Sequence, residues 1–218
     1  MLSWHRIDTV MLDMDGTLLD LYFDNLLWNE LLPELYARAR GMTVEAARSE
    51  IYHDLKEIRH TLEFYCLDHW CRRTQLDILG LHREITHLIQ FRPDAEAFLD
   101  TLATSSRRVI LVTNAHPDAL ALKNEVTNLA DRMDGLISSH QFNAPKEDQS
   151  FWQDLSRVET FDPARTLFID DTQAVLDAAH EYGIGHLLCV TQPDSQRPPR
   201  TDLGYPAFNH FNEIMPAL

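Results

Sequence analysis

Residues 9–17 read TVMLDMDGT, and this stretch decides the fold. Its first residues are apolar or β-branched with no alternating polar face, which is typical of a strand buried on both faces of a parallel sheet. Asp13 and Asp15 stand at the carboxyl end of this predicted strand, and Gly16 lets the backbone turn there. We therefore expect both carboxylates to face the crevice in which α/β proteins bind their ligands.

Four more short runs have the same β-rich texture and end in polar residues. They predict strands at 108–114, 135–139, 166–171 and 186–191. Helical patterns fill the intervening segments, at 93–103, 116–130, 147–158 and 172–182. From residue 91 onward helices and strands alternate, which predicts an α/β fold with a doubly wound parallel sheet.

Residues 18–90 interrupt this alternation. They contain helical patterns at 24–39, 43–59 and 62–73, and Pro33 is expected to kink or split the first of these. We therefore predict an α/β core of residues 1–17 and 91–218 and an all-helical inserted domain of residues 18–90. An insertion that follows the first strand lies over the carboxyl edge of the sheet, so we expect it to act as a lid.

The other strand ends add polar side chains to the same crevice. Asp170 and Asp171 end one predicted strand, Thr113 and Asn114 close another, and Lys146 follows a third. With the pair after the first strand, four carboxylates converge, and they repel one another unless a cation lies among them. Carboxylate oxygens suit Mg²⁺, which completes its octahedron with water and substrate phosphate. The sequence therefore predicts a Mg²⁺ site at this crevice.

Each of these features also has a simpler interpretation when it is taken singly. Asp170 and Asp171 are able to cap the helix that follows them, and a lone lysine such as Lys146 is usually a solvated surface charge. A D-x-D pair is common in capped turns. Their joint placement, each at or just beyond the end of a predicted strand, favours a shared functional site.

The segments DMDGTLLD, VTN and FIDD, with Lys146 between the last two, resemble the four motifs of the haloacid dehalogenase superfamily of phosphohydrolases. The helical insertion resembles the C1-type cap of that superfamily. The resemblance implies that Asp13 is a nucleophile that forms an aspartyl-phosphate and that Asp15 is the general acid and base. Dehalogenases of the superfamily lack an acid at the position of Asp15, so its presence favours phosphate esters.

The same resemblance assigns the other site residues. It implies that the phosphoryl oxygens are held by Thr113, Asn114 and Lys146. It implies that Mg²⁺ is held by Asp13, by the backbone carbonyl of Asp15, and by Asp170 or Asp171. Which member of the last pair binds the metal directly is left open by the sequence.

The inserted domain carries aromatic and hydrogen-bonding side chains, which suit a nucleobase because a base needs a stacking partner and edge hydrogen bonds. The candidate substrate-binding residues are Phe23, Asn25, Arg59, Phe64 and Tyr65. The segments LLDLYFDN, TNAHP and PKEDQ resemble bacterial nucleotidases of the superfamily that act on GMP and IMP. The resemblance thus implies a Mg²⁺-dependent 5′-nucleotidase for purine nucleoside monophosphates.

Two other kinds of function stay open. A sugar-phosphate phosphatase or a phosphomutase of the same superfamily uses the same aspartates. A receiver-like phospho-acceptor module also carries acidic residues, a threonine and a lysine at its strand ends, although receivers are shorter and lack a helical cap.

The charge of the chain limits its partners. The 218 residues include 19 Lys and Arg against 34 Asp and Glu, a formal net charge of −15. This surplus repels a nucleic-acid backbone and excludes a general DNA- or RNA-coating role. A small phosphorylated molecule is compatible with the charge when a metal ion lies between. The oligomeric state is not fixed by any feature of the sequence.

The N-terminal residues and the cysteines indicate where the protein is located. The first ten residues lack the apolar stretch of a signal peptide, and no run has the length of a membrane span, so we expect a cytoplasmic protein with no membrane contact. Cys66, Cys71 and Cys189 have no metal-type spacing, and we expect packed free thiols. The eleven histidines are scattered, and His116 is expected to support the crevice or lie at the surface.

Overall fold

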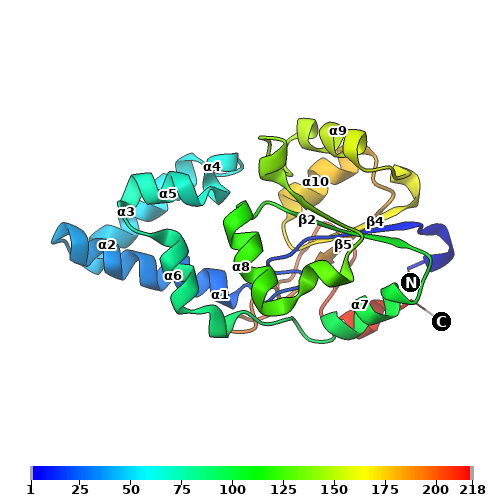
Figure 1. Ribbon diagram of the computed structural model, residues 1–218, viewed down its shortest axis with the longest axis horizontal. Coiled ribbons are helices and arrows are strands. Elements are labelled where there is room, and N and C mark those ends of the chain that lie inside the picture. Colours follow the sequence, from blue (N-terminus) through cyan, green and yellow to red (C-terminus); the bar gives the residue numbers. More distant parts are fainter. Residues whose placement is uncertain (1, 217–218) are drawn as a thin grey trace.

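The computed structural model describes residues 2–216 and contains a six-stranded parallel sheet in the order β3-β2-β1-β4-β5-β6 (Figure 1). The strands are β1 (Thr9–Leu12), β2 (Arg108–Thr113), β3 (Gly135–Ser138), β4 (Thr166–Asp170), β5 (His186–Val190) and β6 (Ala207–Phe208). The first five are the predicted strands, each within one residue of its expected end. We did not predict β6, which is two residues long and pairs with the last residues of β5.

Four helices cover the sheet, with α7 and α8 on one face and α9 and α10 on the other (Figure 1). They are α7 (Ala95–Ala103), α8 (Pro117–Thr127), α9 (Gln149–Val158) and α10 (Gln173–Tyr182). Strand β1 shows why both faces are covered. Val10 and Leu12 join one buried cluster with Phe98 of α7, whereas Met11 joins a second with Trp152 of α9. The predicted doubly wound α/β class is confirmed.

The chain between β1 and α7 is helical. Its α-helices are α1 (Tyr22–Leu26), α2 (Leu32–Arg40), α3 (Val44–Glu57), α4 (Leu62–Tyr65), α5 (Leu67–Thr74) and α6 (Ile78–Glu84). We call residues 18–90 the cap and the rest of the chain the core, a domain division that we propose. Helix α6 was not predicted, because Gly80 and a short apolar run obscure its pattern.

Two predicted cap helices are interrupted. The π-helical turn Leu27–Leu31 joins α1 to α2, whose second residue is Pro33. Proline has no N–H to offer the carbonyl four residues earlier, and a wider turn relieves the mismatch, so the expected kink takes the form of a π-turn. The predicted helix at 62–73 is divided at Cys66, where the backbone is extended between α4 and α5.

The two segments that connect cap and core lie side by side. The amide of Asp20 donates to the carbonyl of Gln90 at 2.9 Å, which ties the outgoing segment to the returning one. Arg92 is buried, and its guanidinium donates to the carbonyls of Thr17, Gln192 and Asn209. Hydrogen bonds therefore join the two connecting segments to each other and to the core.

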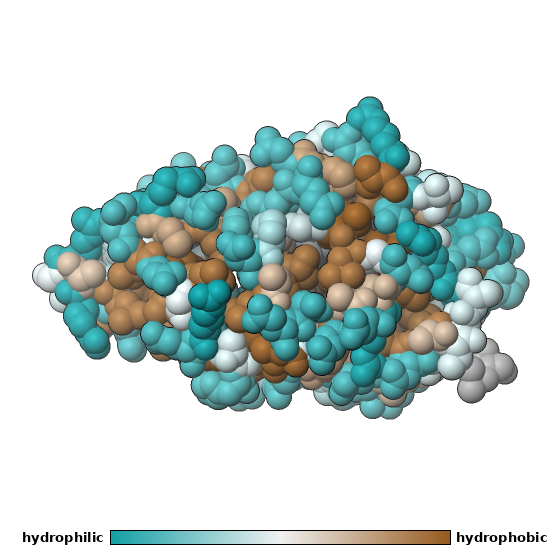
Figure 2. All heavy atoms as spheres, viewed as in Figure 1, coloured by the Kyte–Doolittle hydropathy of each residue, from teal (hydrophilic) through white to brown (hydrophobic). Residues whose placement is uncertain are grey.

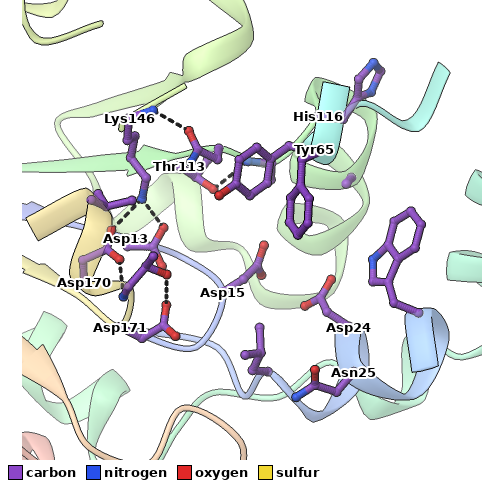
Figure 3. A pocket seen from close by; sticks show the side chains of 18 of the residues that line it. Asp13, Asp15, Asp24, Asn25, Tyr65, Thr113, His116, Lys146, Asp170 and Asp171 are labelled. Atoms are coloured by element: carbon purple, nitrogen blue, oxygen red, sulfur yellow. Dashed lines mark hydrogen bonds and ion pairs between the residues drawn. The ribbon is translucent and has the colours of Figure 1, made fainter. Parts of the chain in front are cut away.

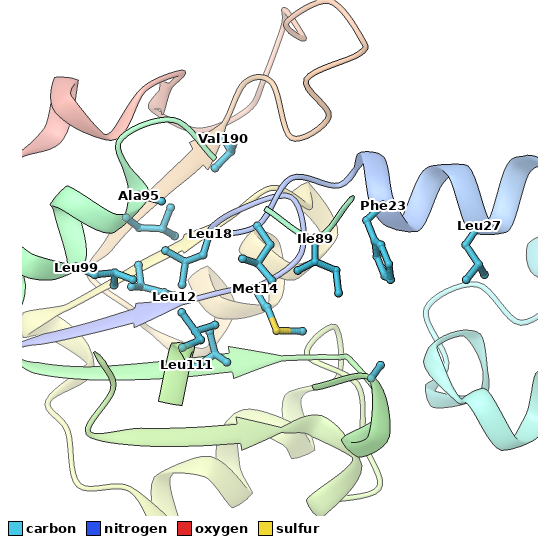
Figure 4. Close-up of a cluster of buried hydrophobic side chains, with 14 of the residues drawn as sticks. Leu12, Met14, Leu18, Phe23, Leu27, Ile89, Ala95, Leu99, Leu111 and Val190 are labelled. Carbon is cyan, nitrogen blue, oxygen red and sulfur yellow. The ribbon is translucent and has the colours of Figure 1, made fainter. Parts of the chain in front are cut away.

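One hydrophobic cluster runs from the sheet into the cap. Figure 4 shows it passing from Leu12 through Met14 and Leu18 to Phe23 and Leu27 of the first cap helices. Figure 2 shows hydrophilic side chains along the edge of this face and patches of hydrophobic ones over its middle. Within residues 2–216, no helix combines the length and apolar character that a membrane crossing requires.

Candidate active site

The carboxyl ends of β1, β2 and β4 meet where the order of the strands reverses. The chain proceeds from β1 to β2 and β3 on one side of the sheet and continues with β4 to β6 on the other. Leu12 pairs with Leu111 of β2 and with Ile169 of β4. Asp13, Thr113 and Asp170, which follow those residues, are therefore brought together at a topological switch point.

Lys146 lies between two of the carboxylates (Figure 3). Its Nζ donates to Oδ1 of Asp13 at 2.5 Å, to Oδ2 of Asp170 at 2.7 Å and to the carbonyl of Val112 at 3.1 Å. Burial lowers the pKa of Lys146, but the attraction of Asp13 and Asp170 outweighs it and the net shift is upward. Lys146 is thus a buried cation of the site and not a solvated surface charge.

Three buried carboxylates form one cluster. Asp13, Asp170 and Asp171 each offer an oxygen, and these atoms lie within 4.8 Å of one another. Burial raises the pKa of Asp13 to about 7, with repulsion from Asp170 adding to it and Lys146 opposing it. Burial likewise raises the pKa of Asp170 and that of Asp171 to about 6. A divalent cation among hard oxygen ligands would remove this repulsion, so the donor set fits Mg²⁺.

Asp170 and Asp171 have different surroundings. One oxygen of Asp170 accepts from Lys146, and the other accepts from the amide of Thr172 at 2.8 Å. Asp171 has a single long contact from the Thr172 hydroxyl at 3.3 Å and lies 3.9 Å from the guanidinium of Arg200. Protein donors therefore hold Asp170 more firmly than they hold Asp171.

Gly16 is required where the loop after β1 passes Asp171. Its φ is +84°, and a Cβ at this position would lie 2.9 Å from Cγ of Asp171 and 3.0 Å from Cβ of Pro193. Only glycine accepts both the left-handed backbone and the close approach without strain. The turn expected from the sequence thus also sets the position of Asp15.

Thr113 and Asn114 follow β2 and hold their loop in different ways. The Thr113 hydroxyl oxygen accepts from the amide of Ala115 at 3.0 Å, which leaves its proton to donate to an anion. The Asn114 side chain accepts from the amide of Lys146 at 2.9 Å and donates to Glu147 at 2.9 Å. Because the Asn114 side chain holds the Lys146 loop, a contact with phosphate is left to its backbone.

A cavity of about 390 Å³ opens between these residues and the cap. Its volume lies within the range of roughly 300–1,000 Å³ that small-molecule sites occupy. Four of the five candidate substrate-binding residues line it, namely Asn25, Arg59, Phe64 and Tyr65. His116 lines it too. The cavity therefore brings the cap residues and the strand-end residues to one space.

Phe23 is a correction to the expected set of substrate-binding residues. It is 1% exposed and belongs to the hydrophobic cluster that links sheet and cap, and it does not line the cavity. Its ring lies 5.5 Å from the ring of His82, and Nζ of Lys123 lies 5.1 Å from its centre. An apolar ring at this position is used for packing.

Lys123 and Asp24 are members of the site that we did not predict. Nζ of Lys123 donates to Asp15 at 2.6 Å and to both oxygens of Asp24 at 2.8 and 2.9 Å. Burial and then repulsion from Asp24 raise the pKa of Asp15 to about 6, against the opposing effect of Lys123. Lys123 shares the buried face of α8 with Ala119 and Leu122. A lysine on the apolar face of a predicted helix is the one sequence feature that indicates a buried ion pair here.

Glu147 is a second residue that was missed. It accepts from the Tyr65 hydroxyl at 2.7 Å, and its other oxygen accepts from Asn114. Burial and then the Glu147 carboxylate raise the pKa of Tyr65 well above its usual value, so the phenol stays neutral. Together with the Lys123–Asp24 pair, this contact connects the cap to the core on two sides of the cavity. Tyr65 and Glu147 lie 82 residues apart in the chain, so their spacing in the sequence does not predict this contact.

Comparison with known sequences identifies related proteins. Residues 7–183 match the family described as haloacid dehalogenase-like hydrolase. The chain is 42% identical over 217 residues to the GMP/IMP nucleotidase YrfG of Escherichia coli, and the match spans 100% of this chain and 98% of that protein. The protein of the same name from Shigella flexneri matches equally well. The resemblance drawn from the motifs is thereby confirmed.

Solved structures share the fold. The HAD phosphatase from Thermococcus onnurineus has a TM-score of 0.77 at 20% identity, covering 95% of this chain and 96% of that one. The putative HAD-hydrolase YfnB from Bacillus subtilis, described as bound to magnesium, has a TM-score of 0.67 at 16% identity, covering 96% and 97%. The L-2-haloacid dehalogenase from Xanthobacter autotrophicus has a TM-score of 0.58 at 18% identity, covering 87% and 80%. These structures support the core fold with its helical insertion.

Proposed function

The chain is a phosphoric monoester hydrolase that belongs to the haloacid dehalogenase-like family, and from this premise we propose that it is a Mg²⁺-dependent 5′-nucleotidase preferring GMP and IMP. The observation that carries the reaction is the buried Asp13 held against Lys146, with Asp15 two residues further on. The substrate preference is supported by the full-length similarity to proteins named GMP/IMP nucleotidase.

In the first step that we propose, a carboxylate oxygen of Asp13 attacks phosphorus. Lys146 holds Oδ1 of Asp13, which leaves Oδ2 to form the new bond while the ester P–O bond breaks. The departing nucleoside oxygen takes the proton of Asp15. Because the pKa of Asp15 lies at about 6, this carboxyl group is able both to give and to accept a proton near neutrality.

In the second step, water attacks the phosphorus of the aspartyl-phosphate. Asp15 accepts the proton of the attacking water, the bond between Asp13 and phosphorus breaks, and inorganic phosphate leaves. Asp13 returns as a carboxylate and Asp15 as a carboxylic acid, so both are ready for another cycle. Thr113 donates to a phosphoryl oxygen in both steps, and Lys146 holds another by giving up its 3.1 Å contact with the Val112 carbonyl, which places the reacting atoms in line.

The metal ligands that we propose are Asp13, Asp171 and the backbone carbonyl of Asp15. Asp170 has both oxygens engaged by protein donors, so its part is to hold Lys146 and the start of α10. Asp171 is the freer carboxylate of the pair. When bound, Mg²⁺ would offset the charge of these carboxylates and of the phosphoryl group.

Recognition of the base is assigned to the cap. Phe64 and Tyr65 offer aromatic surface, with ring centres 4.9 Å apart. Asn25 already donates to Asp194 at 2.7 Å, whereas Arg59 is exposed and lines the cavity. GMP and IMP share an acceptor oxygen at position 6 of the purine, and AMP carries a donor there. We therefore assign the choice of 6-oxo purines to Arg59.

We propose the cytoplasm as the compartment. Cys66, Cys71 and Cys189 are all free thiols. A reducing compartment keeps thiols in that state.

Release of inorganic phosphate from a panel of monoesters tests the function. We expect GMP and IMP to be hydrolysed with a kcat/KM at least about tenfold above those of AMP and glucose 6-phosphate, a difference of about 1.4 kcal/mol in transition-state binding. Arg59→Met is expected to narrow this preference and Asp13→Asn to abolish turnover. Equal turnover of sugar phosphates would contradict the proposed preference for purine nucleotides but not the proposed hydrolysis of phosphate monoesters. Transfer of phosphate without its release would favour a phosphomutase.

A further inference from the structure

Three side chains that commonly bind transition metals meet outside the carboxylate cluster. Cys66, His116 and His140 each offer one ligand atom, and the three atoms lie within 4.8 Å of one another. Cys66 stands between α4 and α5 of the cap, where the helix predicted from the sequence is divided. His116 begins α8, and His140 lies in the 3₁₀ turn Ser139–Gln141 after β3. The group therefore contains one residue of the cap and two of the core.

His140 has a ring nitrogen that lacks a partner. Its Nε2 is buried and meets no hydrogen-bond partner within residues 2–216. The ring of His140 lies edge-on to the ring of His116, with ring centres 5.0 Å apart and 76° between the planes. A buried imidazole nitrogen without a partner, next to a second histidine and a cysteine, is suited to bind a metal ion.

His116 and Asp68 complete the surroundings. Nδ1 of His116 accepts from the amide of Asp118 at 3.3 Å, and the Asp118 carboxylate lies 3.7 Å from it. Ligation through Nε2 moves the ring proton to Nδ1, which then gives up the contact with the amide and donates a hydrogen bond to the Asp118 carboxylate. Nε2 of His116 lies 3.9 Å from the Asp68 carboxylate, which comes from α5 of the cap and is exposed.

We propose that Cys66, His116 and His140 bind a thiophilic divalent cation such as Zn²⁺, with Asp68 or water as fourth ligand. A thiolate with two imidazole nitrogens favours Zn²⁺ over Mg²⁺, whereas the carboxylate cluster favours Mg²⁺. The Cys66 thiol loses its proton on binding, so one proton is released for each ion bound. The two sites thus differ in both place and metal preference.

A cation at this site connects the cap to the core. Cys66 directly follows Tyr65, whose hydroxyl donates to Glu147 of the core, so the ion would reinforce an existing contact. Because the cap has to move for a nucleotide to enter or leave, occupancy slows turnover. Binding of the cation is independent of the proposed function, and only this effect on turnover rests on it.

Co²⁺ is the probe for the site, because a thiolate ligand gives Co²⁺ a near-ultraviolet charge-transfer band. The full chain is stripped of metal, returned to excess Mg²⁺ to saturate the carboxylates, and titrated with Co²⁺. We expect one Co²⁺ per chain with a thiolate band, displaced by Zn²⁺. Cys66→Ser is expected to remove the band, and His140→Ala to weaken binding by at least about 100-fold. Cys71→Ser, which changes a half-buried cysteine of α5, is the matched control and keeps the band.

Thermal melting of the same variants keeps the test independent of activity. Zn²⁺ is expected to raise the Tm of the wild type and of Cys71→Ser but not that of Cys66→Ser, because only a native-state ligand stabilises the fold. A wild type without the thiolate band, a band that persists in Cys66→Ser, or equal loss in Cys71→Ser overturns the site. A band without inhibition of phosphate release by Zn²⁺ overturns the effect on the cap. A band in a chain that does not hydrolyse GMP supports the site and contradicts only the proposed function.

Discussion

At the scale of single residues, the site is governed by how two lysines are shared among carboxylates. Lys146 serves Asp13 and Asp170, and Lys123 serves Asp15 and Asp24. The first pairing holds the nucleophile that we propose, and the second holds the acid and base. The two functions thus depend on two separate buried cations.

Asp24 is expected to set the pH at which Asp15 loses its proton. Replacing Asp24 by asparagine removes a negative charge whose repulsion raises the pKa of Asp15. Asp15 is then the only carboxylate paired with Lys123 among its two present partners. The pKa of Asp15 then falls by about one unit. Because the first step needs a protonated Asp15, the basic limb of the kcat/KM profile should move to lower pH. Glu125→Gln, on the exposed face of α8, is the control, and an unmoved limb in Asp24→Asn would contradict the role of Asp15.

Lys123 is expected to matter for stability as well as activity. Lys123→Met leaves Asp15 and Asp24 facing each other without a cation, which should lower the free energy of unfolding by about 3 kcal/mol. Adding Asp24→Asn to this variant removes the repulsion and should restore part of the loss. Urea denaturation of the single and double variants measures both effects. Additive losses in the double variant would show that the two residues are not coupled.

The residues of the site differ in how well the sequence predicts them. Asp13, Asp15, Thr113, Asp170 and Asp171 were predicted because each lies at a strand end, and strand ends converge in a parallel sheet. Lys123, Glu147 and the partners of Cys66 become neighbours only through packing of the cap on the core. Phe23 was misassigned because an aromatic residue in a cap helix has the same local pattern whether it packs or binds.

At the scale of elements, the loop after β1 carries the strictest local requirement. Gly16 passes Asp171 so closely that an added Cβ would meet its carboxyl group. The strands themselves were predicted within a residue because buried parallel strands are continuous apolar runs. The cap helices were predicted less well, since a π-turn, an extended Cys66 and a short α6 leave weak periodic signals.

Gly16→Ala tests that loop, and Gly41→Ala is its control. Both glycines have positive φ, so each alanine costs about 1–2 kcal/mol of backbone strain. A Cβ at Gly41 meets nothing within 4 Å, whereas one at Gly16 displaces Asp171. We expect Gly16→Ala to lose more Tm than Gly41→Ala, because the clash adds to the strain, and only Gly16→Ala to lose at least about tenfold in kcat/KM, with weaker Mg²⁺ dependence. Equal kinetics in the two variants would contradict this account of the loop.

At the scale of the whole molecule, the net charge of −15 includes four carboxylates crowded into one crevice. The acidic balance argues against nucleic-acid binding and, at the crevice, argues for a divalent cation. Two contacts tie the cap to the core, Lys123 with Asp24 and Glu147 with Tyr65. Lys123 links the charge of the crevice to the position of the cap, because it donates to Asp15 of the core and to Asp24 of the cap.

Stability should depend on pH and Mg²⁺ together. The pKa values of Asp13, Asp15, Asp170 and Asp171 are raised from 3.8 to about 6 or 7 in the folded protein. The native state therefore binds more protons than the unfolded state in this window, and without metal its stability falls as pH rises from about 4 to about 7. Bound Mg²⁺ favours the ionised forms and opposes that loss.

Mg²⁺ is thus expected to raise the Tm more at about pH 7.5 than at about pH 5, where protons compete for the carboxylates. Thermal melts with and without Mg²⁺ at both pH values measure the effect, and Asp171→Asn should reduce the difference. An equal shift at both pH values in the wild type would place the stabilising ion elsewhere.

Asp13 is expected to carry the phosphoryl group during turnover, and a rapid acid quench detects it there. The enzyme is mixed with GMP and Mg²⁺, quenched within one turnover, digested and analysed by mass spectrometry. We expect one added phosphoryl group on the peptide that contains Asp13, absent in Asp13→Asn and reduced in Asp15→Asn, which lacks the acid that the first step needs. Hydrolysis of GMP with the phosphoryl group on another residue would contradict it.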